Sequence, residues 1–215
     1  MNKDLSNYRK SYEKSELLKK NVPENPLELF QKWFYDIDSN FPTDEANAMT
    51  LATVGIDGTP TNRVVLLKKY TYEGFIFYTN YNSEKGNAIA NNPNVCLSFF
   101  WHGAERQIVI KGKAEKISEN LSDGYFESRP VGSQLGALAS NQSEPIENRE
   151  LLDEKLKKLE KKYLNKEVPR PKHWGGYIVK PLEIEFWQGR PNRMHDRIRY
   201  QLQKDYNWKI DRLQP

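Results

Sequence analysis

The most chemically distinctive part of this sequence lies near its C-terminal end. Residues 187–200 contain four arginines, one of the chain's three histidines, a tryptophan and a tyrosine. Cationic and aromatic side chains at this density suit a planar, anionic ligand better than a folding core. The segment follows a strand-like pattern over residues 176–187, so we expect it to leave the edge of a sheet and to close a pocket.

A second group of residues that could bind an anion begins in the run 63–68. In a strand, Arg63, Val65 and Leu67 share one face, while Val64, Leu66 and Lys68 share the other. Positive charge at both ends of an apolar strand could bracket a phosphate and the polar edge of a ring system. The alternative is an ordinary amphipathic strand with solvated ends. Neighbouring elements could add the polar residues Tyr78, Thr79, Ser83, Lys85 and Gln107.

A third group consists of Tyr125, Arg129 and Ser133, which follow one another at intervals of four residues. One unbroken helix would place them on one face, but Pro130 favours a helix–turn–helix junction because the residue before proline avoids the α region. Hydroxyls, a guanidinium and the free N–H groups of a new helix would together suit a phosphate. The alternative is an ordinary Ser-Arg-Pro turn.

The elements that would position these groups are mainly strands. Residues 48–113 contain short apolar runs divided by turns, which predicts an antiparallel sheet closing into a barrel. Ser83 is expected to cap a short helix over residues 84–91. Further strands are predicted at the last long apolar run and at the terminal edge. The predicted strands are 49–54, 62–68, 75–79, 95–101, 105–111, 176–187 and 208–213.

Helices are predicted on either side of this central region. Asn25-Pro26 is a helix start, with asparagine as N-cap and proline at the first helical position. Residues 118–164 read as a helical insertion that breaks at Arg129-Pro130 and ends in a charged helix over 150–164. Residues 1–25 are polar and are expected to form a mobile arm. Residues 26–215 are expected to form a single domain.

The composition excludes several classes of protein. The net charge of +4, from 33 basic and 29 acidic residues, is too mixed to indicate nucleic acid as a partner. No apolar run is long enough to span a bilayer and no signal peptide is visible, so we expect no membrane partner. A single cysteine indicates a reducing, cytoplasmic setting. A mean hydropathy of −0.85 argues weakly for burial between subunits of a dimer.

Sequence motifs for common catalytic sites are missing. The chain has no GxGxxG after a strand, no P-loop, no HExxH, no CxxC and no GxSxG. We therefore expect no metal site and no nucleophilic cysteine. A chain poor in acid–base groups and rich in anion-binding groups indicates that an organic cofactor supplies the reactivity.

Five motifs in one order and spacing resemble the pyridoxamine 5′-phosphate oxidase family, the flavin enzymes of vitamin B6 metabolism. They are RVVLLK at 63–68, YTNYNSEK at 78–85, ESRPVGSQLGALASNQS at 127–143, WQGRPNRMHDR at 187–197 and WKIDRLQP at 208–215. The resemblance covers nearly the whole chain, and the RxHDR segment is distinctive. It implies a homodimer of FMN-binding split β-barrels, mainly β with flanking helices and antiparallel, with FMN at the subunit interface.

The resemblance also implies an activity and its residues. The reaction is the oxidation of pyridoxine or pyridoxamine 5′-phosphate to pyridoxal 5′-phosphate by O₂, with release of H₂O₂ and, from the amine, NH₃. The implied FMN contacts are Arg63, Val64, Val65, Leu66, Leu67, Lys68, Tyr78, Thr79, Lys85, Gln107, Gln142, Ser143, Trp187 and Arg197. The implied substrate contacts are Arg9, Tyr12, Lys68, Tyr125, Arg129, Ser133, Arg193 and His195.

Within that set, Arg193 and His195 are the implied catalytic residues and lie against the pyridine ring, opposite the flavin. Arg193 would stabilise charge on the substrate. His195 would position or deprotonate the substrate, or serve as a hydrogen-bonding partner only. Arg9 and Tyr12 match residues that fold over the bound substrate as a lid. Glu84 departs from the family, which often has a base there; we expect it to point to solvent, with weaker FMN binding or a compensating cation.

Three other functions are compatible with parts of the sequence. Another split-barrel flavin enzyme, such as a flavin reductase, would share the FMN contacts but would not need the substrate residues. A non-catalytic binder of flavin or pyridoxal phosphate could keep them all, so turnover decides between the two. A nucleic-acid-binding barrel could use Phe99, Phe100 and Trp101 for stacking. Consecutive aromatics alternate between the two faces of a strand, however, which is unlike a stacking platform.

Overall fold

The computed structural model describes residues 3–42 and 45–215. Its contacts divide the chain into two compact units. Unit 1 contains the residues up to Thr50, Leu97–Lys111 and Pro181–Pro215, and unit 2 contains Leu51–Cys96 and Gly112–Lys180. The division of the chain into a mobile arm and one domain at residue 26 stays a prediction.

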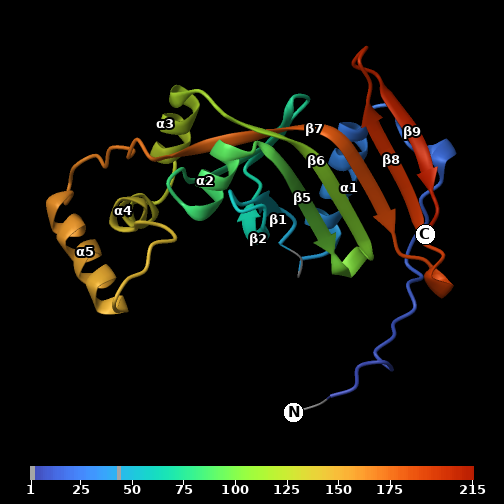
Figure 1. Ribbon diagram of the computed structural model, residues 1–215, viewed down its shortest axis with the longest axis horizontal. Coiled ribbons are helices and arrows are strands. Elements are labelled where there is room, and N and C mark those ends of the chain that lie inside the picture. The colour runs from blue at the N-terminus through green and yellow to red at the C-terminus, as the bar shows by residue number, and fades with distance from the viewer. Residues whose placement is uncertain (1–2, 43–44) are drawn as a thin grey trace. The chain divides into compact units, whose positions relative to one another are not determined.

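The strands form a sheet in the order β2-β1-β5-β6-β7-β4-β3, with β8 paired to β7 and β9 paired to β8 (Figure 1). The pairs β3–β4, β4–β7, β7–β8 and β8–β9 are antiparallel, as the sequence predicted. The strands are β1 (Ala48–Val54), β2 (Pro60–Leu66), β3 (Lys69–Thr71), β4 (Gly74–Asn80), β5 (Asn94–Trp101), β6 (Arg106–Lys116), β7 (Trp174–Gln188), β8 (Asp196–Leu202) and β9 (Trp208–Leu213).

Unit 1 is built around helix α1 (Pro26–Asn40). The Asn25 side chain accepts a hydrogen bond from the Leu27 amide at 2.9 Å, so the predicted N-cap is confirmed. Edge-to-face aromatic contacts fix the buried face of the helix. The ring of Phe30 lies 5.4 Å from that of Phe99, and the ring of Trp33 lies 5.2 Å from that of Phe186.

Among the described residues, no helix is both long and apolar enough to cross a membrane.

Contrary to our expectation, the cation-rich C-terminal segment does not simply leave the edge of the sheet. It turns back and pairs as β8, with Trp187 opposite Arg197 and Gln188 opposite Asp196. Ile198 and Tyr200 are fully buried, while Arg197 and Arg199 are partly exposed. This alternation is an ordinary strand pattern that the four arginines obscured. Only residues 189–195 form the connecting loop, with the short helical turn η3 (Pro191–Arg193) inside it.

Unit 2 contains the other four α-helices of the described residues (Figure 1). The predicted break near Pro130 is confirmed, because one helix ends at Glu127 and the next begins at Val131. Phe126, Leu135, Val168 and Trp174 form a buried cluster that holds this junction against the start of β7. The helices are α2 (Glu84–Asn91), α3 (Glu119–Glu127), α4 (Val131–Ala139) and α5 (Arg149–Lys162).

The strand predicted over residues 62–68 ends early, at Leu66. The amide of Lys68 donates to the carbonyl of Ile76 at 2.8 Å, so the chain has already begun to pair with β4. The short strand β3, which the sequence analysis missed, continues that pairing. Because the chain changes its neighbour between Leu66 and Lys69, Lys68 lies at a crossover rather than at the end of one strand.

Helix α2 packs closely against the backbone of Asn80 and Tyr81 because residue 86 is a glycine. A Cβ at Gly86 would lie 2.8 Å from the Asn80 carbonyl oxygen and nearer still to that of Tyr81. Alanine normally stabilises a helix relative to glycine by up to ~1 kcal/mol, but a clash with backbone costs roughly 1–3 kcal/mol. We expect Gly86→Ala to lower the urea midpoint of unfolding, followed by circular dichroism.

Gly124→Ala in α3 is the matched control, because a Cβ there meets nothing within 4 Å. We expect it to leave the urea midpoint unchanged or to raise it. Equal midpoints for the two variants would contradict the close approach of α2.

Candidate functional site

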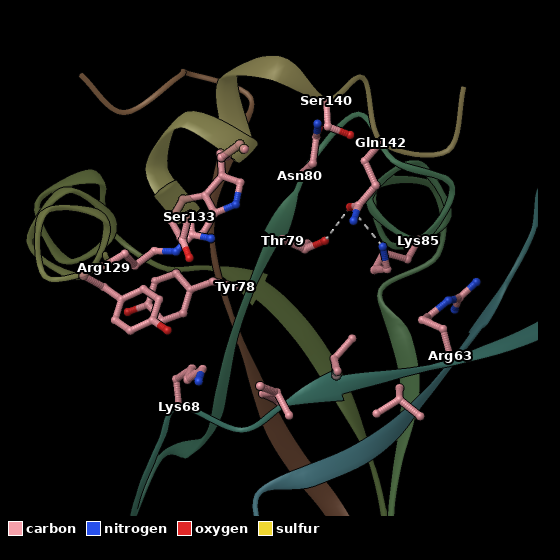
Figure 2. A pocket seen from close by; sticks show the side chains of 17 residues that line it. Arg63, Lys68, Tyr78, Thr79, Asn80, Lys85, Arg129, Ser133, Ser140 and Gln142 are labelled. Carbon is pink, nitrogen blue, oxygen red and sulfur yellow. Dashed lines mark hydrogen bonds between the residues drawn. The ribbon is translucent and has the colours of Figure 1, made fainter. Parts of the chain in front are cut away.

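Unit 2 contains a cavity of about 690 Å³ in which the second and third predicted groups meet (Figure 2). The lining comes from β2, the chain between β2 and β3, β4, α2, α3, α4, the chain after each of α3 and α4, and the first residue of β7. Twelve of the predicted site residues line it: Arg63, Val64, Val65, Leu66, Lys68, Tyr78, Thr79, Lys85, Tyr125, Arg129, Ser133 and Gln142. Figure 2 shows Arg63 and Lys85 at one end of the cavity and Arg129 and Lys68 at the other.

Arg63 is fixed by hydroxyl groups on β1 and β2. Its guanidinium donates to Thr53 Oγ1 and to Thr61 Oγ1, each at 2.7 Å. It also pairs with Glu84 at 3.2 Å, and the Glu84 side chain is 62% exposed. Glu84 therefore points outward, as expected, but it partly neutralises a cation of the cavity.

Lys85 is a buried cation. Its Nζ donates to Gln142 Oε1 at 3.1 Å and to Ser83 Oγ at 3.4 Å, and the Thr79 hydroxyl also donates to Gln142 Oε1 (Figure 2). Burial lowers the pKa of Lys85, the charge of Arg63 lowers it further, and Glu84 opposes the shift. An anion bound in the cavity would offset this cost of removing the ammonium from water.

Arg129 is held at the other end by stacked aromatic rings. Its guanidinium carbon lies 4.6 Å above the ring of Trp174. The Tyr78 ring stacks on Tyr125 at 3.9 Å and on Trp174 at 5.5 Å. Burial lowers the pKa of Arg129, and its Nη1 is buried without a hydrogen-bond partner among the described residues. A buried donor without a partner is costly, so this atom favours an anionic oxygen.

The turn that carries Arg129 is held by Gln134 of α4. Its amide nitrogen donates to the carbonyls of Phe126, Glu127 and Arg129 at 3.0–3.1 Å. Carbonyls at a helix end need such partners. The amide of Ser133 already donates to the Pro130 carbonyl at 2.8 Å, so this residue offers its side-chain hydroxyl to a ligand rather than its backbone.

The sequence analysis missed part of the lining of this cavity. The additional residues are Asn80, Gly136, Ala137, Ser140 and Trp174. Trp174 precedes the strand that we predicted from Gly176, and it reaches the cavity because β7 begins there, opposite Asn80. The order of strand pairing, which local pattern does not reveal, places it in the site.

Unit 1 contains a second cavity, of about 670 Å³. Arg9, Tyr12, Arg193 and His195, all predicted from the sequence, line it together. The rings of Tyr12 and His195 lie 5.7 and 4.7 Å from the ring of Trp187, and so they share an aromatic cluster. The residues of the lining that we did not anticipate are Tyr8, Lys10, Ser11, Arg190 and Asn192.

The loop that carries Arg193 has an unusual backbone. Asn192 and Arg193 have φ of 56° and 61°, a left-handed backbone conformation that residues other than glycine adopt uncommonly. Such residues each cost on the order of 1 kcal/mol and concentrate at functional sites. Both side chains are exposed to the cavity rather than packed in the core.

His195 is held in one protonation form. Its Nδ1 accepts a hydrogen bond from the Arg190 amide at 3.1 Å, so the neutral ring carries its proton on Nε2. Burial lowers the pKa of His195, and the neighbouring charge of Arg193 lowers it further. The ring is therefore a neutral donor through Nε2 near pH 7. This arrangement disfavours proton uptake, because a proton on Nδ1 would face the amide.

Five predicted residues line neither cavity: Leu67, Gln107, Ser143, Trp187 and Arg197. Leu67 is buried in the core. Arg197 makes a two-point ion pair with Glu185, at 2.7 and 3.0 Å, which raises its pKa. The proposed cofactor contacts of these five residues stay predictions.

Comparison with known proteins identifies the relatives of the chain. Residues 41–163 match the model for pyridoxamine 5′-phosphate oxidase. Residues 174–215 match the model for the pyridoxine 5′-phosphate oxidase C-terminal dimerisation region. A pyridoxine/pyridoxamine 5′-phosphate oxidase of Flavobacterium psychrophilum is 68% identical over 213 residues, which cover 99% of this chain and 100% of the relative.

Two solved structures resemble the fold. PhzG from Burkholderia lata, in complex with tetrahydrophenazine-1-carboxylic acid, has a TM-score of 0.86 and 30% identity, covering 93% of this chain and 98% of its own. A pyridoxamine 5′-phosphate oxidase-related, FMN-binding protein from Nostoc punctiforme has a TM-score of 0.69 and 15% identity, covering 86% and 96%. These matches confirm the predicted antiparallel split barrel with flanking helices.

The protonated nitrogen of the His195 ring and the pH at which the ring becomes charged can be measured directly. We expect nitrogen-15 NMR at pH 7 to show Nε2 protonated and Nδ1 unprotonated, because the Arg190 amide faces Nδ1. The lowered pKa means that the ring becomes charged only at a pH below the ordinary value of ~6.5. Its contribution to stability is therefore present above ~6.5 and is lost as the pH falls through the lower folded pKa.

Arg193→Met supplies the comparison for this titration. It removes a neighbouring positive charge, so we expect the His195 midpoint to rise towards the ordinary value. A wild-type proton on Nδ1, or a midpoint that does not move in Arg193→Met, would contradict the proposed environment of the ring.

Proposed function

This chain belongs to the pyridoxine/pyridoxamine 5′-phosphate oxidase family, and we propose that it oxidises pyridoxine and pyridoxamine 5′-phosphates to pyridoxal 5′-phosphate. FMN is the proposed cofactor and O₂ the proposed acceptor, with release of H₂O₂ and, from the amine, NH₃. The observation that carries the proposal is the convergence of two phosphate-binding groups, predicted separately from the sequence, on one cavity of unit 2.

The residues of unit 2 fit FMN. Arg63, Lys85, Thr79 and Gln142 offer two cations and polar side chains to a phosphate, and Lys85 is held there against the cost of its burial. Val64, Val65 and Leu66 add an apolar wall beside these charges. Bound FMN would supply the hydride-accepting and O₂-reducing chemistry that the side chains lack.

The substrate phosphate is assigned to Lys68, Tyr125, Arg129 and Ser133. Lys68, Arg129 and Ser133 lie at the end of the cavity away from Arg63 and Lys85 (Figure 2). Tyr125 also lines the cavity and stacks on Tyr78. The Nη1 of Arg129 has no hydrogen-bond partner in the part of the chain that the structure describes, which supports this assignment because a phosphate oxygen would be its acceptor. The stack of Tyr78, Tyr125 and Trp174 restricts the guanidinium before a ligand arrives.

The reacting ring of the substrate is assigned to Arg193 and His195, with Arg9 and Tyr12 as covering residues. Arg193 would stabilise charge on the substrate in the transition state, since the backbone already places its side chain at the cavity. His195 would donate a hydrogen bond from Nε2. Of the two active roles left open by the sequence, the Arg190 amide at Nδ1 favours positioning over deprotonation.

A homodimer is the proposed assembly. The match of residues 174–215 to a dimerisation region supports it. We place FMN at the subunit interface and the protein in the cytoplasm, in line with the family resemblance and the single cysteine of the chain.

The substrate residues argue against a flavin reductase, which would not require Tyr125, Arg129 and Ser133 in the cavity. A storage protein for flavin or pyridoxal phosphate could use every one of these contacts. Electron transfer from the substrate separates an oxidase from such a binder.

The decisive experiment mixes FMN-loaded protein with pyridoxine 5′-phosphate in the absence of O₂ and follows the visible flavin band. We expect the band to bleach, because electrons pass from the substrate to the flavin. Admission of O₂ should restore the band and yield H₂O₂. A band that persists while the substrate is bound would refute the oxidase and favour a binder.

Arg193→Met tests the active role of this residue in the same assay. We expect the bleaching rate to fall by about 10²-fold, the loss typical of one charge-stabilising donor. FMN should stay bound, because Arg193 does not line the cavity assigned to FMN. An unchanged bleaching rate would remove Arg193 from catalysis.

Glu84→Gln tests whether the outward carboxylate weakens cofactor binding. Removal of the charge frees Arg63 from its ion pair and removes an acid from the proposed phosphate end. An exposed pair is worth at most ~1 kcal/mol, so FMN should bind roughly two- to fivefold more tightly by flavin fluorescence, with a smaller gain at high salt. Glu154→Gln on α5 is the charge-matched control, and equal FMN affinity in both variants would contradict the role of Glu84.

A further inference from the structure

We propose that Glu105 is a positioning residue. It fixes which residues of the N-terminal segment lie against the loop that carries Arg193 and His195. The N-terminal segment is defined as residues 8–17, and the loop as residues 189–195. All of these residues belong to unit 1. The effect on substrate binding rests on the proposed function, whereas the anchoring of the segment does not.

The carboxylate of Glu105 reaches the N-terminal segment across the turn between β5 and β6. Its Oε2 accepts hydrogen bonds from the amides of Glu13 at 2.8 Å and Lys14 at 3.1 Å. Its Oε1 lies 3.5 Å from Lys10 Nζ, and the side chain is only 3% exposed. A buried carboxylate needs such partners, and here the N-terminal segment supplies them.

The backbone of Glu105 holds the start of the 189–195 loop. The carbonyl of Glu105 accepts from the Gly189 amide at 2.8 Å and from Gln188 Nε2 at 3.2 Å. One residue therefore binds the N-terminal segment through its side chain and the start of the 189–195 loop through its main chain. Glu105 has φ of 58°, and this left-handed turn aims the two groups at different segments.

The contact between these two segments is tight enough for register to matter. A Cβ at Gly189 would lie 2.7 Å from Cβ and Cγ of Tyr12, so the tyrosine packs directly on the loop backbone. Its ring is 5.9 Å from the ring of His195. A shift of one residue along the N-terminal segment would separate Tyr12 from the Gly189 backbone and from the ring of His195.

A second buried carboxylate holds the segment further along the chain. Asp196 accepts from the Leu17 amide at 3.0 Å, and Arg190 donates to the Ser15 carbonyl at 3.0 Å. Glu105 binds the amides of residues 13 and 14, which are closer to Tyr12 in the chain than Leu17, to which Asp196 binds. Its loss should therefore release the part of the segment that lines the cavity, while residues 15–17 stay attached.

The test compares Glu105→Ala with Glu105→Gln and with Glu115→Ala. The glutamine keeps an acceptor oxygen for the two amides. Glu115 is an exposed acid of unit 2 that pairs with Lys180, so its loss controls for charge. The first measurement, on FMN-loaded protein, is the rate of trypsin cleavage after Arg9, Lys10 and Lys14, followed by mass spectrometry. The others are the dissociation constant for pyridoxal 5′-phosphate and the KM and kcat for pyridoxine 5′-phosphate.

We expect Glu105→Ala to raise the cleavage rate, the dissociation constant and KM, each by about tenfold, with a smaller change in kcat. Glu105→Gln should recover most of the loss and Glu115→Ala should match the wild type. Unchanged cleavage in Glu105→Ala would overturn the anchoring. Faster cleavage with unchanged ligand binding would overturn the positioning role.

Gly189→Ala keeps the proposal testable if Glu105→Ala does not fold. The added methyl group would displace Tyr12 while leaving the Glu105 carboxylate in place. We expect faster cleavage after Arg9 and Lys10 and weaker pyridoxal 5′-phosphate binding, and wild-type behaviour would overturn the register argument. Cleavage and equilibrium binding need no turnover, so an inactive wild type would refute the oxidase function without deciding this test.

Discussion

Positive charge withdrawn from water is the constraint on which the unit 2 cavity depends. Lys85 bonds to an amide oxygen and a hydroxyl, and Arg129 stacks on Trp174, so neither has a carboxylate hydrogen-bond partner in the described part of the chain. Burial lowers the pKa of both groups. Hydrogen bonds hold the Lys85 ammonium, and a stacked ring holds the Arg129 guanidinium. A bound phosphate would offset the free-energy cost of burying both charges.

The side chains around the two cavities hold and orient a ligand more readily than they move protons. His195 has Nδ1 occupied by a backbone amide and a neighbouring arginine that disfavours its charged form. The remaining groups that we assign to the substrate are cations and hydroxyls. Such a set is consistent with a chain that places a substrate against a reactive cofactor and leaves the bond-breaking chemistry to that cofactor.

Features set by local chemistry could be predicted from the sequence, whereas features set by strand pairing could not. The caps at Asn25 and Ser83 and the break at Pro130 depend on neighbouring residues, and all three were found. Strand β8 was missed because its arginines suggested a ligand-binding loop. Ile198 and Tyr200 nevertheless alternate with the arginines in the pattern of a strand. Trp174 and Glu105 act on residues distant in sequence, so periodicity gives no sign of their roles.

The N-terminal segment illustrates why a few buried carboxylates can control a larger region. Residues 3–18 contain neither helix nor strand, so their order does not come from regular backbone pairing. Fixing each backbone residue costs ~1–2 kcal/mol, which contacts with the rest of unit 1 must offset. The hydrogen bonds that do so are concentrated at residues 13–17, on Glu105, Asp196 and Arg190. Order at Arg9 and Tyr12 therefore depends on anchors that follow them in the chain, together with the packing of Tyr12 on Gly189.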